Sequence, residues 1–109
     1  MTSPWGVFIA EPAKADILGA AEYISRTLCN PSAAQRLLDD LEAAIRSLST
    51  HPARHRAVPV SPWRERGYHG FCIRNHLILY RIDARERTIH VARVFHATQD
   101  WVSRLDSLR

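Results

Sequence analysis

The side chain best suited to chemistry in this chain is His96, which closes a β-rich run near the C-terminal end. An imidazole exchanges protons near neutral pH, so a histidine placed there can act as a general acid or base. The alternative is structural, with His96 hydrogen-bonded to Asp100 or to the region of Thr98 and anchoring the terminal segment. We favour the structural role and keep the acid–base role open.

Metal binding and nucleophilic catalysis find little support in the sequence. The candidate ligands are His69, Cys72, His76 and His90, but the spacing of His69 and Cys72 within one strand points their side chains to opposite faces. The chain has only four glycines, without a Gly-rich phosphate loop, and no serine stands in a nucleophile elbow. We therefore expect no metal and no cofactor.

Charge is distributed unevenly along the chain. Residues 1–50 carry four basic and six acidic side chains, whereas residues 51–96 carry nine arginines and three acids. A basic half presented by strands and loops suits an acidic partner, either protein or nucleic acid, although a solvated arginine-rich surface explains it equally well. Within this half, Trp63 lies in a proline-rich loop beside Arg64 and Arg66. We expect Trp63 to be exposed and to anchor an interface.

The length of 109 residues fits a single domain, residues 1–109, with one hydrophobic core. No apolar run reaches the roughly 18 residues of a membrane span, and no secretory signal is recognised, so we expect a cytoplasmic protein. Cys29 and Cys72 lie in unlike contexts and are expected as reduced, half-buried thiols.

The first half is expected to hold one short strand, within Trp5–Ile9, and two helices. From Ala13, apolar residues recur every three to four positions: Ile17, Ala20 or Ala21, Ile24 and Leu28. Asn30 is the expected N-cap of the second helix and Pro31 its first residue. The apolar stripe of that helix comprises Ala34, Leu37, Leu38, Leu41, Ile45 and Leu48. The short connection predicts an antiparallel helical hairpin.

The second half is expected to form three strands. The first alternates from Tyr68, with Phe71 and Ile73 sharing one face. Arg74 and Asn75 form a plausible tight turn, since asparagine tolerates a positive φ. The next run is apolar on both faces, as in a central strand, and spans Leu77–Ile82.

The charged segment Asp83–Arg87 is expected to be a hairpin loop before the last strand. In that strand alternation places Ile89, Val91 and Phe95 on one face and His90, Ala92 and Val94 on the other. A short amphipathic helix follows, with Thr98 as N-cap and with Trp101, Val102, Leu105 and Leu108 on its apolar side. The predicted class is α+β in the order β-α-α-β-β-β-α, with a helical hairpin packed on a largely antiparallel four-stranded sheet.

This order, and several phrases within it, resemble the RelE/ParE superfamily of bacterial toxins over nearly the whole chain. The phrases are Ala13-x-x-Asp16-Ile17-x-x-Ala20-x-x-Tyr23-Ile24, Asn30-Pro31-x-Ala33-Ala34, Leu48-x-x-x-Pro52, Arg66-Gly67-Tyr68, Asn75-His76-x-Ile78-x-Tyr80-Arg81 and Arg93-Val94-x-His96-x-x-x-Asp100-Trp101. The resemblance implies the toxin of a type II toxin–antitoxin system, though it supports the fold more firmly than the function.

RelE-like members of the superfamily cleave messenger RNA on the ribosome and keep lysines or arginines along the second and third strands. This chain instead has Gly70 and Cys72 at the outward positions of the second strand and Leu77 at the start of the third. The resemblance would leave His96, Arg74 and Arg81 as catalytic residues of such a ribonuclease. Because the phosphorane would lack its cations, we treat the ribonuclease as the alternative.

ParE-like members share the scaffold and bind DNA gyrase, and the phrase from Asn75-His76 to Tyr80 favours this branch. Many relatives carry arginine where this chain has His69. The resemblance implies a small acidic antitoxin as partner, whose disordered tail folds on the toxin to form a hetero-oligomer. The expected partner-binding residues are Trp63, Arg64, Arg66, Arg81 and Arg93, with a structural ion pair favoured for Arg93. A third alternative is an inactive relative that only binds antitoxin.

Overall fold

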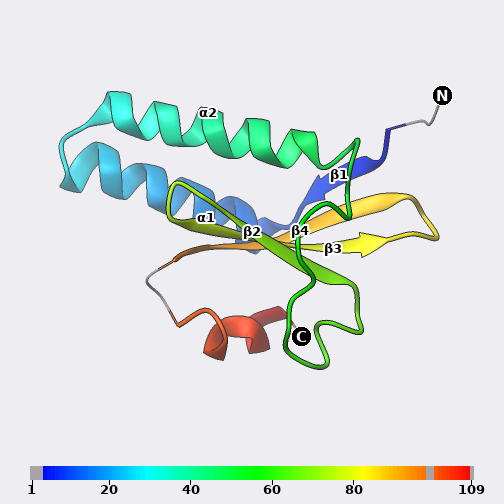
Figure 1. The fold of residues 1–109 in the computed structure, drawn as a ribbon. Helices are drawn as coiled ribbons and strands as arrows, with labels where there is room; N and C mark the ends of the chain where they lie inside the picture. The colour runs from blue at the N-terminus through cyan, green and yellow to red at the C-terminus, as the bar shows by residue number, and fades with distance from the viewer. Residues whose placement is uncertain (1–3, 98–99, 109) are drawn as a thin grey trace.

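A helical hairpin lies on one face of a four-stranded sheet in the computed structural model, which describes residues 4–97 and 100–108 (Figure 1). The elements, in chain order, are β1 (Gly6–Ile9), α1 (Glu11–Glu22), a π-helical turn (Tyr23–Thr27), α2 (Pro31–Ser47), β2 (Tyr68–Ile73), β3 (His76–Asp83), β4 (Thr88–His96) and a 3₁₀ helix (Ser103–Leu108). The predicted α+β class and element order are confirmed. None of the described helices is long and apolar enough to cross a lipid bilayer.

The sheet has the strand order β1-β4-β3-β2, with β1 parallel to β4 and the other neighbours antiparallel. β3 is central, as its apolar faces predicted. The turn between β2 and β3 has left-handed φ values of 47° at Arg74 and 63° at Asn75, which confirms the predicted tight turn. At the outer edge of β2, Ala57 forms an isolated bridge to His69.

The two helices begin where local signals place a helix start. The Asn30 side chain accepts a hydrogen bond from the backbone N–H of Ala33, and Pro31 opens α2, as predicted. α1 begins at Glu11, two residues earlier than expected, because its second residue, Pro12, suits the first turn of a helix.

The end of α1 departs from the predicted apolar stripe. The π-helical turn forms a hydrogen bond from the N–H of Leu28 to the carbonyl of Tyr23, five residues back. This wider turn rotates the following residues off the buried stripe. Leu28 is therefore 55% exposed, and its expected place in the core is wrong.

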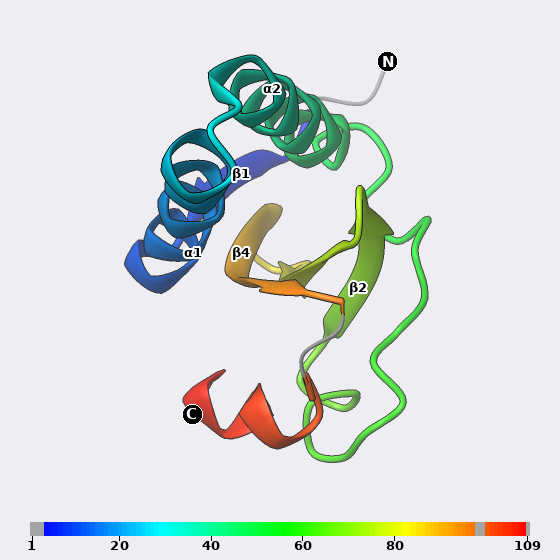
Figure 2. The ribbon, with the colours of Figure 1, turned by 90° about the vertical axis from the view of Figure 1, so that its left-hand side faces the viewer.

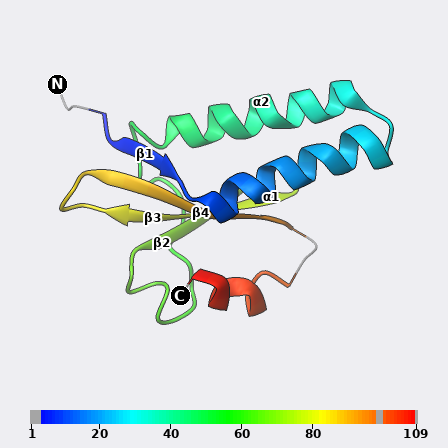
Figure 3. The same cartoon turned by 180° about the vertical axis from the view of Figure 1, so that it is seen from behind.

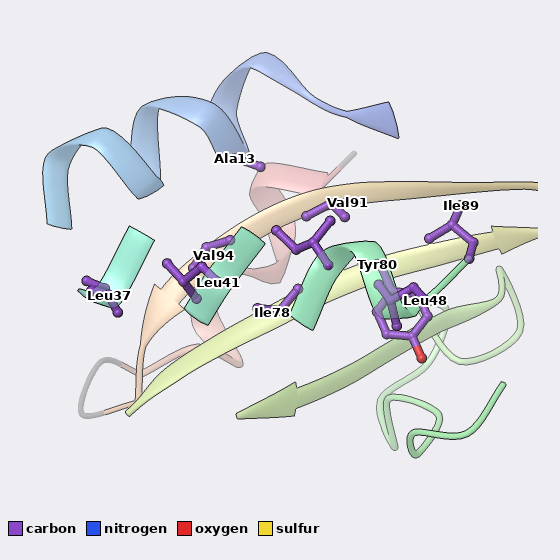
Figure 4. Close-up of a cluster of buried hydrophobic side chains, with 10 residues drawn as sticks. Ala13, Leu37, Leu41, Leu48, Ile78, Tyr80, Ile89, Val91 and Val94 are labelled. Atoms are coloured by element: carbon purple, nitrogen blue, oxygen red, sulfur yellow. The ribbon is translucent and has the colours of Figure 1, made fainter. Parts of the chain in front are cut away.

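The main core lies between the hairpin and the sheet (Figure 4). Leu37 and Leu41 of α2 and its C-cap residue Leu48 face the sheet, and each is at most 3% exposed. The side chains that meet them from the sheet are Ile78, Tyr80, Ile89, Val91 and Val94. The predicted stripe of α2 thus supplies one wall of the core.

A β-bulge changes the two faces of β4. Leu79 pairs with Arg93 and Tyr80 with Val91, so Ala92 is the extra residue. Val94 consequently packs in the helix-side core, whereas Phe95 lies in a second cluster on the opposite face. The expectation that Phe95 shares a face with Val91 is wrong, because strict alternation fails beyond a bulge.

The second cluster lies on the sheet face away from the helices, where the C-terminal 3₁₀ helix and the loop segment 58–63 cover it (Figure 2). Its buried members are Val58, Trp63, Tyr68, Leu79, Phe95 and Leu105. Trp63 is only 3% exposed, so the expectation of an exposed interface anchor is wrong. A large aromatic ring in this loop closes the sheet face that the helical hairpin leaves open.

Two further expectations concern the cysteines and the terminal helix. Cys29 and Cys72 are free thiols as expected, but both are exposed instead of half-buried. The terminal helix is present as a 3₁₀ helix with Leu105 buried. The predicted N-cap Thr98 lies outside the described residues.

Candidate functional site

The antiparallel pairing of β3 and β4 brings two histidines together at one end of the sheet. His76 pairs directly with His96 across β3 and β4, and the two rings meet edge to face with centroids 5.2 Å apart. The Nδ1 of His76 lies 2.9 Å from the carbonyl oxygen of Arg74. Because a carbonyl only accepts, Nδ1 carries the proton, and His76 is held in one tautomer when neutral. His76 is 8% exposed, whereas His96 is exposed.

A groove of about 720 Å³ opens between this end of the sheet and α1. Figure 3 shows α1 in front of β4, with the C-terminal helix below them. Beside both histidines, the groove is lined by Arg74, by Arg104 and by the exposed side chains of Tyr23 and Leu28. The Arg104 guanidinium lies 5.6 Å from the centroid of the Phe95 ring.

Asp16 and Arg93 join α1 to β4 beside this groove. The Arg93 guanidinium donates to both carboxylate oxygens of Asp16, at 2.7 and 2.8 Å. The same carboxylate accepts the backbone N–H of Val94 at 2.9 Å, and Arg93 also donates to Ser107 Oγ. These hydrogen bonds raise the pKa of Arg93. The structural ion pair expected for Arg93 is confirmed, so its side chain is already committed within the molecule.

Arg81 lies far from the two histidines. It pairs with His90 in the sheet, five residues along β3 from His76, which corresponds to about 17 Å of strand. It occupies the face opposite the helices, where its guanidinium lies 4.0 Å from Asp83. The structure therefore brings Arg74 and His96 to one groove and leaves Arg81 outside it.

The sheet face where ribonuclease relatives would carry cations is apolar in this chain. Gly70 is opposite Leu79, and Cys72 is opposite Leu77. A Cβ on Gly70 would lie 3.2 Å from Leu79 Cδ2, so leucine side chains already fill the space above it. Neither β2 nor the first five residues of β3 contain lysine or arginine.

The loop before β2 presents a second basic area. Arg64 and Arg66 are exposed, and the Arg66 guanidinium lies 5.2 Å from the centroid of the buried Trp63 ring. Between them, Glu65 accepts a hydrogen bond from Ser61, which lowers the pKa of this carboxyl. Of the predicted partner-binding residues, Arg64 and Arg66 are exposed.

An aromatic cluster around the buried Tyr80 holds the segment after α2 in place. The Tyr80 hydroxyl donates to the carbonyl oxygen of Pro52 at 2.7 Å, and burial raises the pKa of Tyr80 to about 12. His55 stacks on Phe71 with centroids 3.8 Å apart. Burial, with Arg54 and His69 nearby, lowers the pKa of His55. These contacts link residues far apart in the chain, so no local sequence pattern predicts them.

No cluster of three or more His, Cys, Asp or Glu side chains suited to a metal ion occurs within residues 4–97 and 100–108. The groove instead offers imidazoles, guanidinium groups and a phenol. Sequence reasoning missed Tyr23 and Arg104 as members of this group. Both belong to elements whose course past the sheet follows from tertiary packing.

Comparison with known families gives one match that covers most of the chain. The profile described as "ParE toxin of type II toxin-antitoxin system, parDE" matches residues 7–101. A search of curated proteins found no match.

Solved structures of toxins share the fold at low sequence identity. The RelBE2 toxin–antitoxin complex from Mycobacterium tuberculosis gives a TM-score of 0.63 at 21% identity, covering 91% of this chain and 98% of that one. The chromosomal ParDE system from P. aeruginosa gives 0.70 at 14% identity, with coverages of 87% and 98%. A mutant of the E. coli toxin RelE in the free state gives 0.57 at 12% identity, with coverages of 93% and 92%. At these identities the likeness concerns the fold alone.

Proposed function

Because this chain belongs to the family of ParE toxins of type II toxin–antitoxin systems, we propose that it arrests growth by binding DNA gyrase and trapping the cleaved gyrase–DNA complex. A cognate acidic antitoxin neutralises it in the cytoplasm. In this activity the chain would differ from the ribosome-dependent ribonucleases that share the RelE/ParE fold.

The apolar sheet face around Gly70, Cys72 and Leu77 is the observation that carries this proposal. Cleavage of a phosphodiester needs groups that neutralise the charge of the phosphorane, and one missing electrostatic donor typically raises the barrier by about 3–4 kcal/mol. Leucine side chains fill this face, and the nearest arginine along β3 is Arg81. Because β2 and the first five residues of β3 carry no lysine or arginine, the geometry supports an activity based on binding.

Accessible positive charge supports an acidic partner. The chain has a net charge of +4, and the excess lies in residues 51–96. Arg64 and Arg66 are the exposed members of the predicted partner-binding set, since Trp63 is buried and Arg93 is paired with Asp16. We propose that these two arginines contact the acidic antitoxin.

A gyrase assay with purified protein tests the target. We expect the toxin to inhibit supercoiling and to accumulate cleaved DNA, and we expect equimolar antitoxin to reverse both effects. Translation reactions with ribosomes and messenger RNA, run in parallel, should yield intact transcripts. Transcript cleavage that disappears in His96→Ala would favour the ribonuclease alternative.

Expression in cells separates an active toxin from an inactive relative. The chain expressed alone should arrest growth with filamentation. Co-expression of an adjacent gene that encodes the acidic antitoxin should relieve the arrest. Harmless expression of folded protein that still binds the antitoxin would contradict both toxin activities. The double variant Arg64→Glu/Arg66→Glu should weaken antitoxin binding, whereas Arg46→Glu on α2 serves as a matched charge control.

A further inference from the structure

One end of the groove beside α1 concentrates positively charged and protonatable side chains. We call this the cationic end, and its members are Arg74, His76, His96 and Arg104. The one acid among the groove's lining residues, Asp16, already binds the Arg93 guanidinium through both carboxylate oxygens. Its charge is therefore compensated, and because Arg74 is itself paired with Asp40, the uncompensated positive charge of the cationic end lies on Arg104.

Two arginines reach this end from different elements. Arg74 belongs to the β2–β3 turn and shares its guanidinium with Asp40 of α2, at side-chain exposures of 52% and 44%. Arg104 belongs to the C-terminal 3₁₀ helix, lies over Phe95 and forms no ion pair within the described residues. Guanidinium groups present several donors in a plane, which suits phosphate oxygens.

His76 adds a donor only when it takes up a proton. Its Nδ1–H is committed to the carbonyl oxygen of Arg74, so the neutral ring leaves Nε2 as an acceptor. The other groups around the groove are Asp16 with its partner Arg93, Tyr23, and the arginines named above.

The wall of α1 supplies an aromatic surface next to this charge. Tyr23 is 56% exposed and Leu28 is 55% exposed, and both line the same groove. An exposed aromatic ring beside cations is the arrangement on which nucleobases stack. The groove volume of about 720 Å³ accommodates a small ligand.

We propose that this groove binds a nucleotide, with its phosphate at the cationic end and its base against Tyr23. The ligand is either a free mononucleotide or one nucleotide of a single strand, since both present a phosphate and a base. The groove opens beside β4, between α1 and the C-terminal 3₁₀ helix, whereas Gly70 and Cys72 lie on β2, on the other side of β3. The proposal does not depend on the toxin target.

NMR titration of the histidine Cε1–H resonances tests the site with inorganic phosphate, AMP, adenosine and a short single-stranded oligonucleotide as probes. AMP should bind more tightly than phosphate or adenosine alone and should shift His76 and His96. Binding of AMP indicates a free nucleotide, whereas binding of the oligonucleotide alone indicates a strand.

Variants identify the contacts. Arg104→Gln and His96→Gln should each weaken nucleotide binding by about tenfold, the usual scale of one charge-assisted hydrogen bond. Tyr23→Ala should weaken AMP and leave phosphate binding unchanged. His90→Gln, at the other end of β4, is the matched control. Absence of saturable shifts at millimolar concentrations, or variants that bind like the wild type, would overturn the proposal.

Discussion

The Asp16 carboxylate stabilises the fold through two separate contacts. It neutralises Arg93, and it satisfies the backbone N–H of Val94 on a stretch of β4 that β1 no longer covers. Unpaired backbone N–H groups on an exposed strand edge destabilise the fold or invite pairing with another chain. The Asp16 carboxylate prevents this by accepting the N–H of Val94. The ion pair is therefore part of the structure that positions the groove.

Asp16→Asn should destabilise the protein by about 3 kcal/mol, because Arg93 loses its charge partner while only 19% of its side chain is exposed. Chemical denaturation at neutral pH measures this loss. The control is Glu11→Gln, which breaks the exposed pair with Lys14 and should change stability by less than about 0.5 kcal/mol. Equal effects of the two variants would contradict the structural role of Asp16.

His55 should make stability depend on pH. Its pKa is lowered in the folded state, chiefly by burial, so the unfolded chain binds more protons below the ordinary value of 6.5. The free energy of unfolding should therefore rise with pH between the lowered pKa of His55 and 6.5. Above pH 6.5 this contribution should be fully present. In His55→Phe this part of the pH dependence should vanish, so the variant should lose less stability than the wild type between pH 8 and pH 5.

Thermal unfolding at several pH values checks this expectation, with the exposed His51→Gln as control. A wild type and a His55→Phe variant with parallel pH profiles would show that His55 titrates alike in the folded and unfolded states.

At the scale of elements, two irregularities shape the groove. The π-helical turn after α1 exposes Leu28, and the bulge in β4 turns Phe95 away from the helices while Arg93 reaches Asp16. Bulges and π-turns both re-aim side chains without breaking the element that contains them. Regular versions of the same elements would have placed different side chains beside His76 and His96.

Two glycines should respond oppositely to alanine. Gly67 has φ +89°, and an added Cβ would lie 3.1 Å from the carbonyl oxygen of Ile82, so Gly67→Ala should destabilise the protein by at least about 1 kcal/mol. Gly19 lies within α1 with open space around it, so Gly19→Ala should stabilise by about 0.5–1 kcal/mol. Denaturant midpoints compare the pair, and stabilisation by Gly67→Ala would contradict the turn geometry.

At the scale of the whole molecule, the two halves of the chain differ in the sign of their charge. The helical hairpin carries more acidic than basic residues, whereas the strands and loops after residue 50 carry the basic excess. Charge of one sign on one half of a small protein steers partners of the opposite sign toward that half. This asymmetry concerns association and adds little to the stability of the fold.

Association with the acidic antitoxin should therefore slow as salt rises, while dissociation changes less. Stopped-flow measurements between low and physiological ionic strength test this. Arg64→Gln and Arg66→Gln should reduce the association rate, and Lys14→Gln on α1 should not. A rate that is independent of salt would show that apolar contacts alone guide the encounter.

Much of the fold follows from local patterns. The Asn30-Pro31 start, the stripe of α2 and the turn at Arg74-Asn75 each depend on residues a few positions apart, so they were predictable. The candidate site was only half predictable. His96 and Arg74 were named from the sequence and line one groove, but Tyr23 and Arg104 were not.

The sequence by itself determined the order of elements, the antiparallel hairpin and the charge asymmetry, because periodicity, caps and composition are local properties. Only the tertiary structure decided that Trp63 is buried, that Arg93 binds Asp16 and that Arg81 lies away from His96. Each of these depends on the packing of distant segments and on a single-residue bulge, which shifts every side chain beyond it.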